Sequence, residues 1–334
     1  MTLTVSIIVP CYNEEATIRL LLDSIFAQSY PRELLEVIIS DGLSKDGTRD
    51  RIAAFQSEHP DMRVRVVDNL TRTIPAGLNR AIKVARGDIL IRLDAHSMPY
   101  ADYVARCVQA LEEGRGANVG GVWEVRPGAE DGMAAAIAVA ATHPLGVGDA
   151  MYRLSPQAGP VDTVPFGAFR RALIEKIGEF DERLLSNEDY EFNTRIRQAG
   201  GIVWLDPEIR SVYFSRSTLG GLARQYWRYG FWKFKMLRRY PATLRWRQAL
   251  PPLFAAGLAL LAILGIWSEP ARLALAAGLS LYLAVLLLVA LLAAARQGNI
   301  GLIINLPLAI ATMHLAWGFG FLWSLLSNPS HKDV

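Results

Sequence analysis

Cysteine is scarce in this sequence of 334 residues, which contains only Cys11 and Cys107. Two cysteines so far apart provide neither a disulfide framework nor the paired spacing of a structural zinc site. The sequence therefore excludes a disulfide-rich secreted scaffold and suits a reducing compartment. With 51% hydrophobic and 20% charged residues, it also excludes a disordered or a collagen-like chain.

Charged residues are nearly absent from the last quarter of the chain. Residues 249–334 contain only Glu269, Arg272, Arg296, Lys332 and Asp333. Because a helix of roughly 20 apolar residues crosses a bilayer core, we predict a membrane domain over residues 249–330. The expected transmembrane helices, about three in number, are 249–267, 273–295 and 300–326. Pro307 and Gly301 leave open a second reading, in which the third segment is broken or re-entrant.

Acidic residues are absent from the stretch 224–248, which contains eight basic ones. Together with its large aromatic residues, this pattern over 217–248 is typical of an amphipathic helix on the membrane interface. Nucleic acid is the rival partner, but the apolar segments that follow argue against it. Arg245, Arg247 and Arg296 place the preceding domain in the cytoplasm by the positive-inside rule. The N-terminus lacks the pattern of a signal peptide, which agrees with a cytoplasmic location of this domain. Together with the three apolar segments, this predicts a multi-pass protein of the inner (plasma) membrane.

The first 216 residues alternate between β-branched runs and amphipathic stretches. The expected strands are 5–10, 35–40, 63–67, 88–93, 120–126 and 202–205. The expected helices are 16–28, 76–85, 101–113 and 133–142, followed by an irregular loop over 143–165 and a return to helix over 170–200. This alternation predicts an α/β domain with a parallel sheet covered by helices on both faces. Ligands of such domains bind beyond the carboxyl ends of the strands, so we expect the site at the loops 11–15, 41–48 and 94–99.

Side chains suited to a metal ion follow one of these strands. Asp94 and His96 stand two residues apart and can face one divalent ion, such as Mn²⁺ or Mg²⁺ bridged to phosphate oxygens. Asp41 stands at the end of another strand. In the first loop, Asn13 has a purely structural reading as the N-cap of the following helix.

A second acidic group, Glu188, Asp189 and Glu191, crowds the start of a predicted helix. One reading is structural, with the carboxylates compensating the helix dipole and Asn187 as the N-cap. The other is functional, because like charges crowded in a cleft raise the pKa of at least one carboxyl, as a general base requires. The local pattern leaves both readings open.

Five segments, taken together and in this order, resemble the family 2 glycosyltransferases of GT-A fold. They are SIIVPCYNEE at 6–15, SDGLSKDGT at 40–48, GDILIRLDAH at 87–96, NEDYEFNTRIRQAGG at 187–201 and QYWRY at 225–229. The segments HPLGVGDAMYR and VDTVPFGAFRR are most similar to membrane-bound glucosyltransferases that build exopolysaccharide repeat units on a lipid carrier, as in succinoglycan assembly. The resemblance implies a GT-A (Rossmann-like) nucleotide-sugar-binding domain over 1–216.

The resemblance also implies a donor site and a metal site. The residues that would hold the base and ribose of the sugar nucleotide are Pro10, Tyr12, Glu14 and Asp41. Asp94 and His96 occupy the family's Asp-X-Asp position, where His96 replaces the second aspartate. Asp94 would then be the main ligand of Mg²⁺ or Mn²⁺. The resemblance does not decide whether His96 also contacts the metal.

The catalytic roles implied by the resemblance fall on two further segments. Asp189 would be the general base that deprotonates the acceptor hydroxyl, and Glu188 would support it. Gln225, Trp227 and Arg228 resemble a Gln-X-X-Arg-Trp element in which a tyrosine replaces the tryptophan. This element would close over the donor diphosphate and the acceptor.

The implied activity is an inverting transfer of a sugar, with glucose from UDP-glucose expected, to a lipid-diphosphate-linked saccharide during exopolysaccharide or cell-surface glycan assembly. The product would carry a β-linkage. The implied partners are a nucleotide-sugar donor, a polyprenyl-linked acceptor, the bilayer and other glycan-assembly enzymes, with no nucleic acid. The alternatives are a polyprenyl-phosphate glycosyltransferase and a non-catalytic nucleotide-sugar-binding scaffold.

Overall fold

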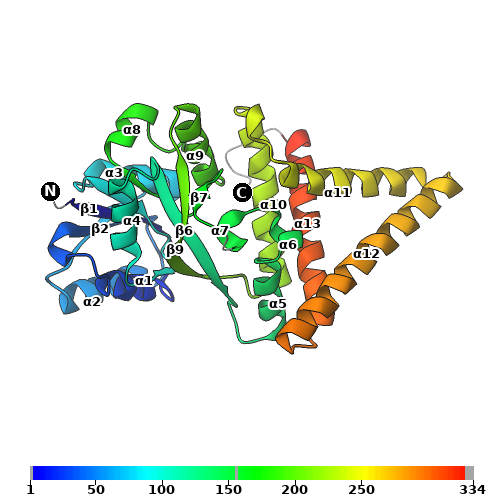
Figure 1. Ribbon diagram of the computed structural model, residues 1–334, viewed down its shortest axis with the longest axis horizontal. Coiled ribbons are helices and arrows are strands. Elements are labelled where there is room, and N and C mark those ends of the chain that lie inside the picture. Colours follow the sequence, from blue (N-terminus) through cyan, green and yellow to red (C-terminus); the bar gives the residue numbers. More distant parts are fainter. Residues whose placement is uncertain (1–2, 155–156, 328–334) are drawn as a thin grey trace. The chain divides into compact units, whose positions relative to one another are not determined.

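The computed structural model describes residues 3–154 and 157–327 (Figure 1). The chain divides into two compact units. The first comprises Met1–Glu124 and Met151–Tyr213, and the second comprises Val125–Ala150 and Phe214–Val334. Residues 125–150, which the sequence pattern left within the α/β domain, thus group with the C-terminal helices.

The first unit is built on a nine-stranded sheet with the order β3-β2-β1-β4-β8-β6-β9-β5, in which β7 also pairs with β9. The strands are β1 (Val5–Cys11), β2 (Leu35–Asp41), β3 (Arg63–Asp68), β4 (Ile89–Arg92), β5 (Ser97–Pro99), β6 (Asn118–Arg126), β7 (Gly159–Pro160), β8 (Ala168–Arg170) and β9 (Val203–Phe214). Strands β3, β2, β1 and β4 are parallel, as expected. The sheet as a whole is mixed, because β5, β7 and β8 pair antiparallel with their neighbours. These strands of two or three residues are too short to carry a periodic pattern.

Helices cover both faces of this sheet. They are α1 (Ile18–Phe26), α2 (Thr48–Glu58), α3 (Ile74–Val84), α4 (Tyr103–Glu112), α7 (Met151–Leu154), α8 (Ala172–Ile177) and α9 (Glu188–Gln198), with a 3₁₀ turn η1 (Arg32–Leu34). Alternate residues of β1 face opposite sides: Ile7 packs with α1, α2 and α4, and Ile8 packs with α3 and α9. The helix expected over 170–200 is wrong in its extent, because β8, α8 and α9 share this stretch and a loop of residues 178–187 interrupts it.

Gly121 lies where β6 comes closest to β9. A Cβ atom at this position would lie 1.7 Å from the carbonyl oxygen of Ile209, which is backbone and cannot move aside. We expect Gly121→Ala to destabilise the first unit by about 1–3 kcal/mol, the usual range for overpacking. A shift of this size lowers the thermal unfolding midpoint by roughly 2–12 °C.

This prediction is checked by intrinsic fluorescence during heating of the purified chain. Gly159→Ala is the matched control, because no atom of the described residues lies within 4 Å of a Cβ atom there. Equal midpoints for the two variants would show that β6 and β9 can separate without loss of stability.

The second unit consists of helices. They are α5 (Gly132–Ala140), α6 (Pro144–Val147), α10 (Leu219–Leu237), α11 (Trp246–Leu264), α12 (Glu269–Gln297) and α13 (Leu302–Leu326), with a 3₁₀ turn η2 (Pro241–Thr243). Helices α11, α12 and α13 are each long and apolar enough to cross a membrane. They overlap the three segments predicted from the sequence, and α13 runs through Pro307 as one continuous helix.

Helix α13 is the packing partner of the shorter helices in this unit. A Cβ atom on Gly230 of α10 would lie 2.1 Å from the carbonyl oxygen of Trp317, so the two helices are in close contact. Leu222 and Tyr226 of α10 share a core with α5 and α13. The aromatic residues of the basic helix are thus buried largely against protein. The arginines of α10 and the turn after it that remain exposed are Arg224, Arg228, Arg238 and Arg239.

Polar contacts also join the helices of this unit. His314 of α13 lies 2.9 Å from the Tyr282 hydroxyl of α12 and 2.8 Å from the Leu145 carbonyl oxygen of α6. Arg245 and Arg247, at the start of α11, both form ion pairs with Asp149. The short helical segment around 144–150 is therefore held by α13 and by the start of α11.

Candidate active site

The loops after β1 and β2 are joined by hydrogen bonds. Asn13 donates its backbone N–H to the Ser44 hydroxyl at 2.8 Å and accepts one from the Lys45 N–H through its side-chain oxygen at 2.9 Å. The Glu14 N–H donates to the Thr48 hydroxyl at 2.8 Å. Because both loops follow neighbouring parallel strands, their ends meet at one edge of the sheet, as the sequence predicted.

Asn13 does not cap the helix that follows it. Helix α1 begins at Ile18, and Thr17 occupies the N-cap position, where its side chain makes no capping hydrogen bond to the described residues of the helix. Asn13 instead adopts a positive φ of 54°, a conformation that asparagine tolerates better than most residues. The N-cap reading of Asn13 is therefore wrong, and its side chain connects the two loops.

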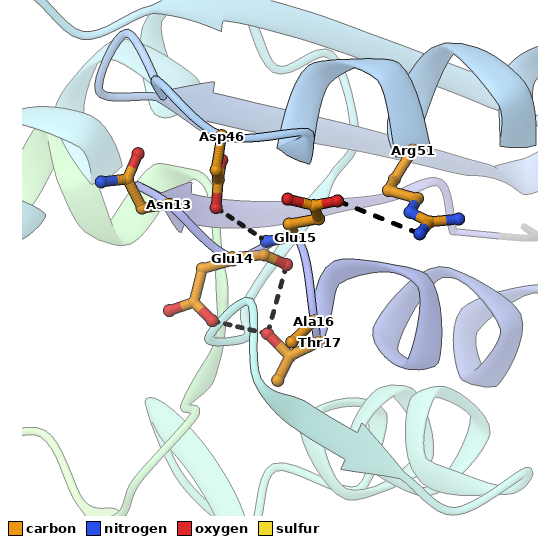
Figure 2. A pocket seen from close by; sticks show the side chains of 7 residues that line it. All are labelled: Asn13, Glu14, Glu15, Ala16, Thr17, Asp46 and Arg51. Atoms are coloured by element: carbon orange, nitrogen blue, oxygen red, sulfur yellow. Dashed lines mark hydrogen bonds and ion pairs between the residues drawn. The ribbon is translucent and has the colours of Figure 1, made fainter.

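A pocket of about 440 Å³ opens beside these loops. Its lining, shown in Figure 2, consists of Asn13, Glu14, Glu15, Ala16, Thr17, Asp46 and Arg51. Glu15 accepts a hydrogen bond from the Gly47 N–H at 2.9 Å and lies 3.9 Å from the guanidinium of Arg51. The lining contains three carboxylates and one guanidinium, so its net charge is negative and repels a diphosphate.

Asp41 is fully buried at the end of β2. Its carboxylate accepts hydrogen bonds from the Ser44 hydroxyl at 2.5 Å and from Arg49 Nε at 2.6 Å. Arg49 also donates to Asp68 at 2.5 Å. In this structure Asp41 therefore shapes the loop from within, and its predicted contact with a nucleotide stays a prediction.

Tyr12 provides an exposed aromatic surface next to Asp41. Its ring packs on Gly42, and 40% of the residue is exposed. The guanidinium carbon of Arg72 lies 5.8 Å from the ring centroid, which is within cation–π range. Pro10, another of the predicted donor-binding residues, is buried within β1.

His96 contacts Glu14. Its Nδ1 atom lies 3.0 Å from Oε1 of Glu14, whose other carboxylate oxygen accepts a hydrogen bond from the Thr17 hydroxyl at 2.5 Å. A residue predicted to bind metal and a residue predicted to bind the nucleotide are thus partners of each other. Metal ligation by His96 stays a prediction.

A buried arginine, Arg92, joins the two acidic groups that the sequence identified. Its Nη2 atom lies 2.9 Å from Oε1 of Glu188 and 3.2 Å from Oδ1 of Asp94, and its Nη1 atom lies 3.2 Å from Oδ1 of Asp189. The side chains of Arg92 and Glu188 are each 6% exposed, whereas that of Asp94 is 24% exposed and that of Asp189 is 35% exposed. The structure therefore brings Asp94, Glu188 and Asp189 together, with the two outer carboxylates accessible.

The local fold at the start of α9 separates the three carboxylates of the second group. Asn187 occupies the N-cap position of α9, as predicted, with a positive φ of 64°, but its side chain makes no capping hydrogen bond to the described residues of the helix. Glu191 is fully buried one turn later and forms a bidentate ion pair with Arg195, at 2.6 and 3.0 Å. Glu191 is thereby held away from Arg92, while Glu188 and Asp189 contact it.

Glu188 is the carboxyl of this group whose pKa is raised. Burial is the largest cause and the charge of Asp189 adds to it, whereas Arg92 opposes it, and the net result raises the pKa of Glu188 to about 7. The ordinary value is 4.5, so between these values the folded protein holds a proton that the unfolded chain has released. Stability is therefore highest below this window and falls as the pH rises through it.

We expect Glu188→Gln to remove this pH dependence. Glutamine can still accept the hydrogen bond from Arg92 but does not ionise, so the variant should gain stability relative to wild type between pH 5 and pH 8. Thermal midpoints at both pH values, measured with a chelator present, check this. Glu113→Gln, an exposed carboxylate, is the control, and parallel curves for wild type and Glu188→Gln would refute the assignment.

Asp94 can serve as a metal ligand together with a substrate. One of its oxygens contacts Arg92, and the side chain is partly exposed. Among residues 3–154 and 157–327, no group of three His, Cys, Asp or Glu side chains is arranged to hold a metal ion. Mg²⁺ is usually held by one or two carboxylates and substrate phosphates. The residues thus fit an ion shared between Asp94 and a diphosphate better than a metal enclosed by protein.

The remaining predicted residues lie on α10 in the second unit. Gln225 donates a hydrogen bond to the Tyr229 hydroxyl at 3.0 Å, one helical turn away. Trp227 and Arg228 are exposed on the same helix. Their closure over a donor and an acceptor stays a prediction.

Arg92, the central residue of the site, was not predicted from the sequence. Arg92 ends an otherwise apolar strand, and a buried cation must be paired with acidic partners. A single arginine in the run ILIRL, two residues before Asp94, was therefore a usable signal. Its partner Glu188 lies 96 residues away, so no local pattern could identify it.

Comparison with known proteins identifies the family. Glycosyl transferase family 2 matches residues 6–178. The chain is 32% identical to the succinoglycan biosynthesis protein ExoA of Rhizobium meliloti, over 96% of this chain and 94% of that protein. It is also 30% identical to a protein of Methanococcus voltae, over 72% of this chain and 76% of the relative. That relative is named dolichyl N-acetyl-alpha-D-glucosaminyl phosphate 3-beta-D-2,3-diacetamido-2,3-dideoxy-beta-D-glucuronosyltransferase.

A solved structure supports the fold. The mannosyltransferase PcManGT of Pyrobaculum calidifontis, in complex with GDP-Man and Mn²⁺, superposes with a TM-score of 0.64. The match covers 97% of this chain and 88% of that one, at 23% identity. The chain is a glycosyltransferase of GT-A fold and belongs to glycosyl transferase family 2.

Proposed function

We propose that this glycosyltransferase moves a sugar from a nucleoside diphosphate donor to a saccharide carried on a lipid diphosphate, with UDP-glucose as the expected donor and a β-linkage in the product. The observation that carries the proposal is the convergence of Asp94 and Asp189 on the buried guanidinium of Arg92. The partly exposed carboxylate of Asp94 suits the metal–diphosphate end of the donor, and that of Asp189 suits the acceptor hydroxyl.

Asp189 is the proposed base, because its carboxylate is accessible whereas that of Glu188 is buried. Asp189 takes the proton of the acceptor hydroxyl while the oxygen attacks the anomeric carbon. The bond from that carbon to the diphosphate breaks, and its electron pair leaves with the diphosphate oxygen. Attack opposite the leaving group inverts the anomeric centre, so an α-linked donor gives a β-linkage.

Asp94 would hold Mg²⁺ or Mn²⁺ as the main ligand, and His96 is the second predicted ligand. Such an ion supplies positive charge that stabilises the departing diphosphate. In this proposal Tyr12 stacks on the nucleotide base, which is supported by the exposure of its ring next to the guanidinium of Arg72. Pro10, Glu14 and Asp41 complete the donor site in this proposal.

The lipid-linked acceptor is supported by two observations. The Methanococcus voltae relative is named for a dolichyl-linked substrate, and the Rhizobium meliloti relative for succinoglycan biosynthesis. Three helices of this chain are long and apolar enough to cross a membrane. We place the catalytic domain at 1–216 on the cytoplasmic side of the inner membrane, with 217–248 at the interface and 249–330 within the bilayer. Gln225, Trp227 and Arg228 would close over the diphosphate and the acceptor.

The experiment is nucleoside diphosphate release by the purified full-length chain in detergent, with UDP-glucose, Mg²⁺ or Mn²⁺, and a membrane lipid extract. We expect release to require both the metal and the lipid extract, and the product to be a disaccharide on a lipid diphosphate. A sugar on a lipid monophosphate would instead identify a polyprenyl-phosphate glycosyltransferase. Donor binding without turnover, over a panel of donors and acceptors, would overturn the proposal in favour of a binding scaffold.

A further inference from the structure

Arg92 is a single buried cation in contact with three carboxylates. Its closest partner is the buried Glu188, at 2.9 Å. Its other partners, Asp94 and Asp189, are both accessible and both 3.2 Å away, and they contact different terminal nitrogens of the guanidinium. The planar guanidinium therefore fixes how far apart these two carboxylates lie.

The contact with Asp189 differs in kind from the contact with Glu188. Nη2 donates a hydrogen bond to Glu188, which anchors the guanidinium from the buried side. Within the described part of the chain, Nη1 and Nε are buried without a hydrogen-bond partner, so the contact of Nη1 with Asp189 is electrostatic. The ion pair with Nη1 therefore restrains Asp189, while Glu188 holds the guanidinium in place.

We propose that Arg92 is a positioning residue that holds the metal-binding carboxylate of Asp94 and the proton-accepting carboxylate of Asp189 in one fixed geometry. The inference rests on the function proposed above, because it takes these two roles as given. Glu188 has the supporting role of orienting Arg92. Lysine cannot replace arginine here, because one ammonium group lacks the rigid fork that spans two carboxylates.

The geometry predicts how the kinetics of an Arg92 variant should change. Misplacing catalytic groups by about 1 Å can reduce the rate about 10²-fold. We therefore expect Arg92→Gln to lower kcat by about 10–100-fold and to raise the metal concentration that gives half-maximal activity, since both carboxylates lose their common partner. KM for the donor should change far less than kcat.

The test compares Arg92→Gln and Arg92→Lys with Arg195→Gln. Arg195 is the matched control, because it also pairs with a buried carboxylate on α9, and its contacts among the described residues are with Glu191, Phe192 and the backbone of residues 177–179. The thermal midpoint of each purified full-length variant is measured first. Then kcat, calculated per folded molecule, is determined together with donor KM and the dependence of the rate on metal concentration. We expect Arg92→Lys to recover stability but not kcat, and Arg195→Gln to lose stability while keeping its turnover.

The outcomes separate the two proposals. If Arg92→Gln loses stability as Arg195→Gln does and keeps the turnover and metal dependence of wild type, Arg92 is structural and the inference is overturned. If Arg92→Gln does not fold, Arg92→Lys decides, and full turnover in that variant overturns the inference. Asp189→Asn is assayed alongside; if it remains active, the proposed base is wrong, whatever the Arg92 variants do.

Discussion

Asp189→Asn should lower kcat by about 10²–10⁴-fold, the usual contribution of a general base. The amide has the same shape as the carboxylate but does not accept a proton at neutral pH. KM for the donor should change little, because Asp189 acts on the acceptor hydroxyl. The measurement is steady-state release of the nucleoside diphosphate, with donor affinity determined separately by titration.

The loss must be distinguished from a general effect of removing a charge. Asp23→Asn is the control, because Asp23 is also a partly exposed aspartate paired with an arginine, Arg19, at 2.8 Å. It lies on α1, which contributes no residue to the Arg92 contacts. Equal turnover for Asp189→Asn and Asp23→Asn would eliminate Asp189 as the base and leave the family assignment intact.

Removing the divalent metal should have an effect of comparable size. A metal ion contributes several kcal/mol to stabilising charge on a leaving phosphate, which corresponds to about 10³-fold in rate. Chelation should therefore abolish measurable turnover, and adding Mn²⁺ or Mg²⁺ should restore it. Asp94→Asn should need far more metal for the same rate, because the amide is a weaker ligand than the carboxylate.

His96→Ala tests the second predicted ligand in the same assay. The imidazole contacts Glu14 at 3.0 Å, so we expect its removal to change donor KM more than metal dependence. A shift in metal dependence as large as that of Asp94→Asn would show that His96 ligates the ion. Activity that is unaffected by chelation would contradict a metal-assisted transfer altogether.

The parallel half of the sheet was predictable because buried parallel strands are continuous β-branched runs. Residues 5–10 and 35–40 were identified in this way, and they are β1 and β2 almost to the residue. Helix α2 was missed because it is mostly polar and buries only Thr48, Ile52 and Phe55. The strands β5, β7 and β8 were missed because they depend on partners far along the chain for their hydrogen bonds.

The sequence by itself determined the chemical class of this protein. Its motifs at the ends of strands identify the family, and the near absence of charge after residue 249 predicts helices able to cross a membrane, because both signals are local. The tertiary structure alone decided which charges meet. Arg92 binds Asp94, Glu188 and Asp189, whereas Glu191 pairs with Arg195, because the fold and not the sequence spacing sets the distance between β4 and α9.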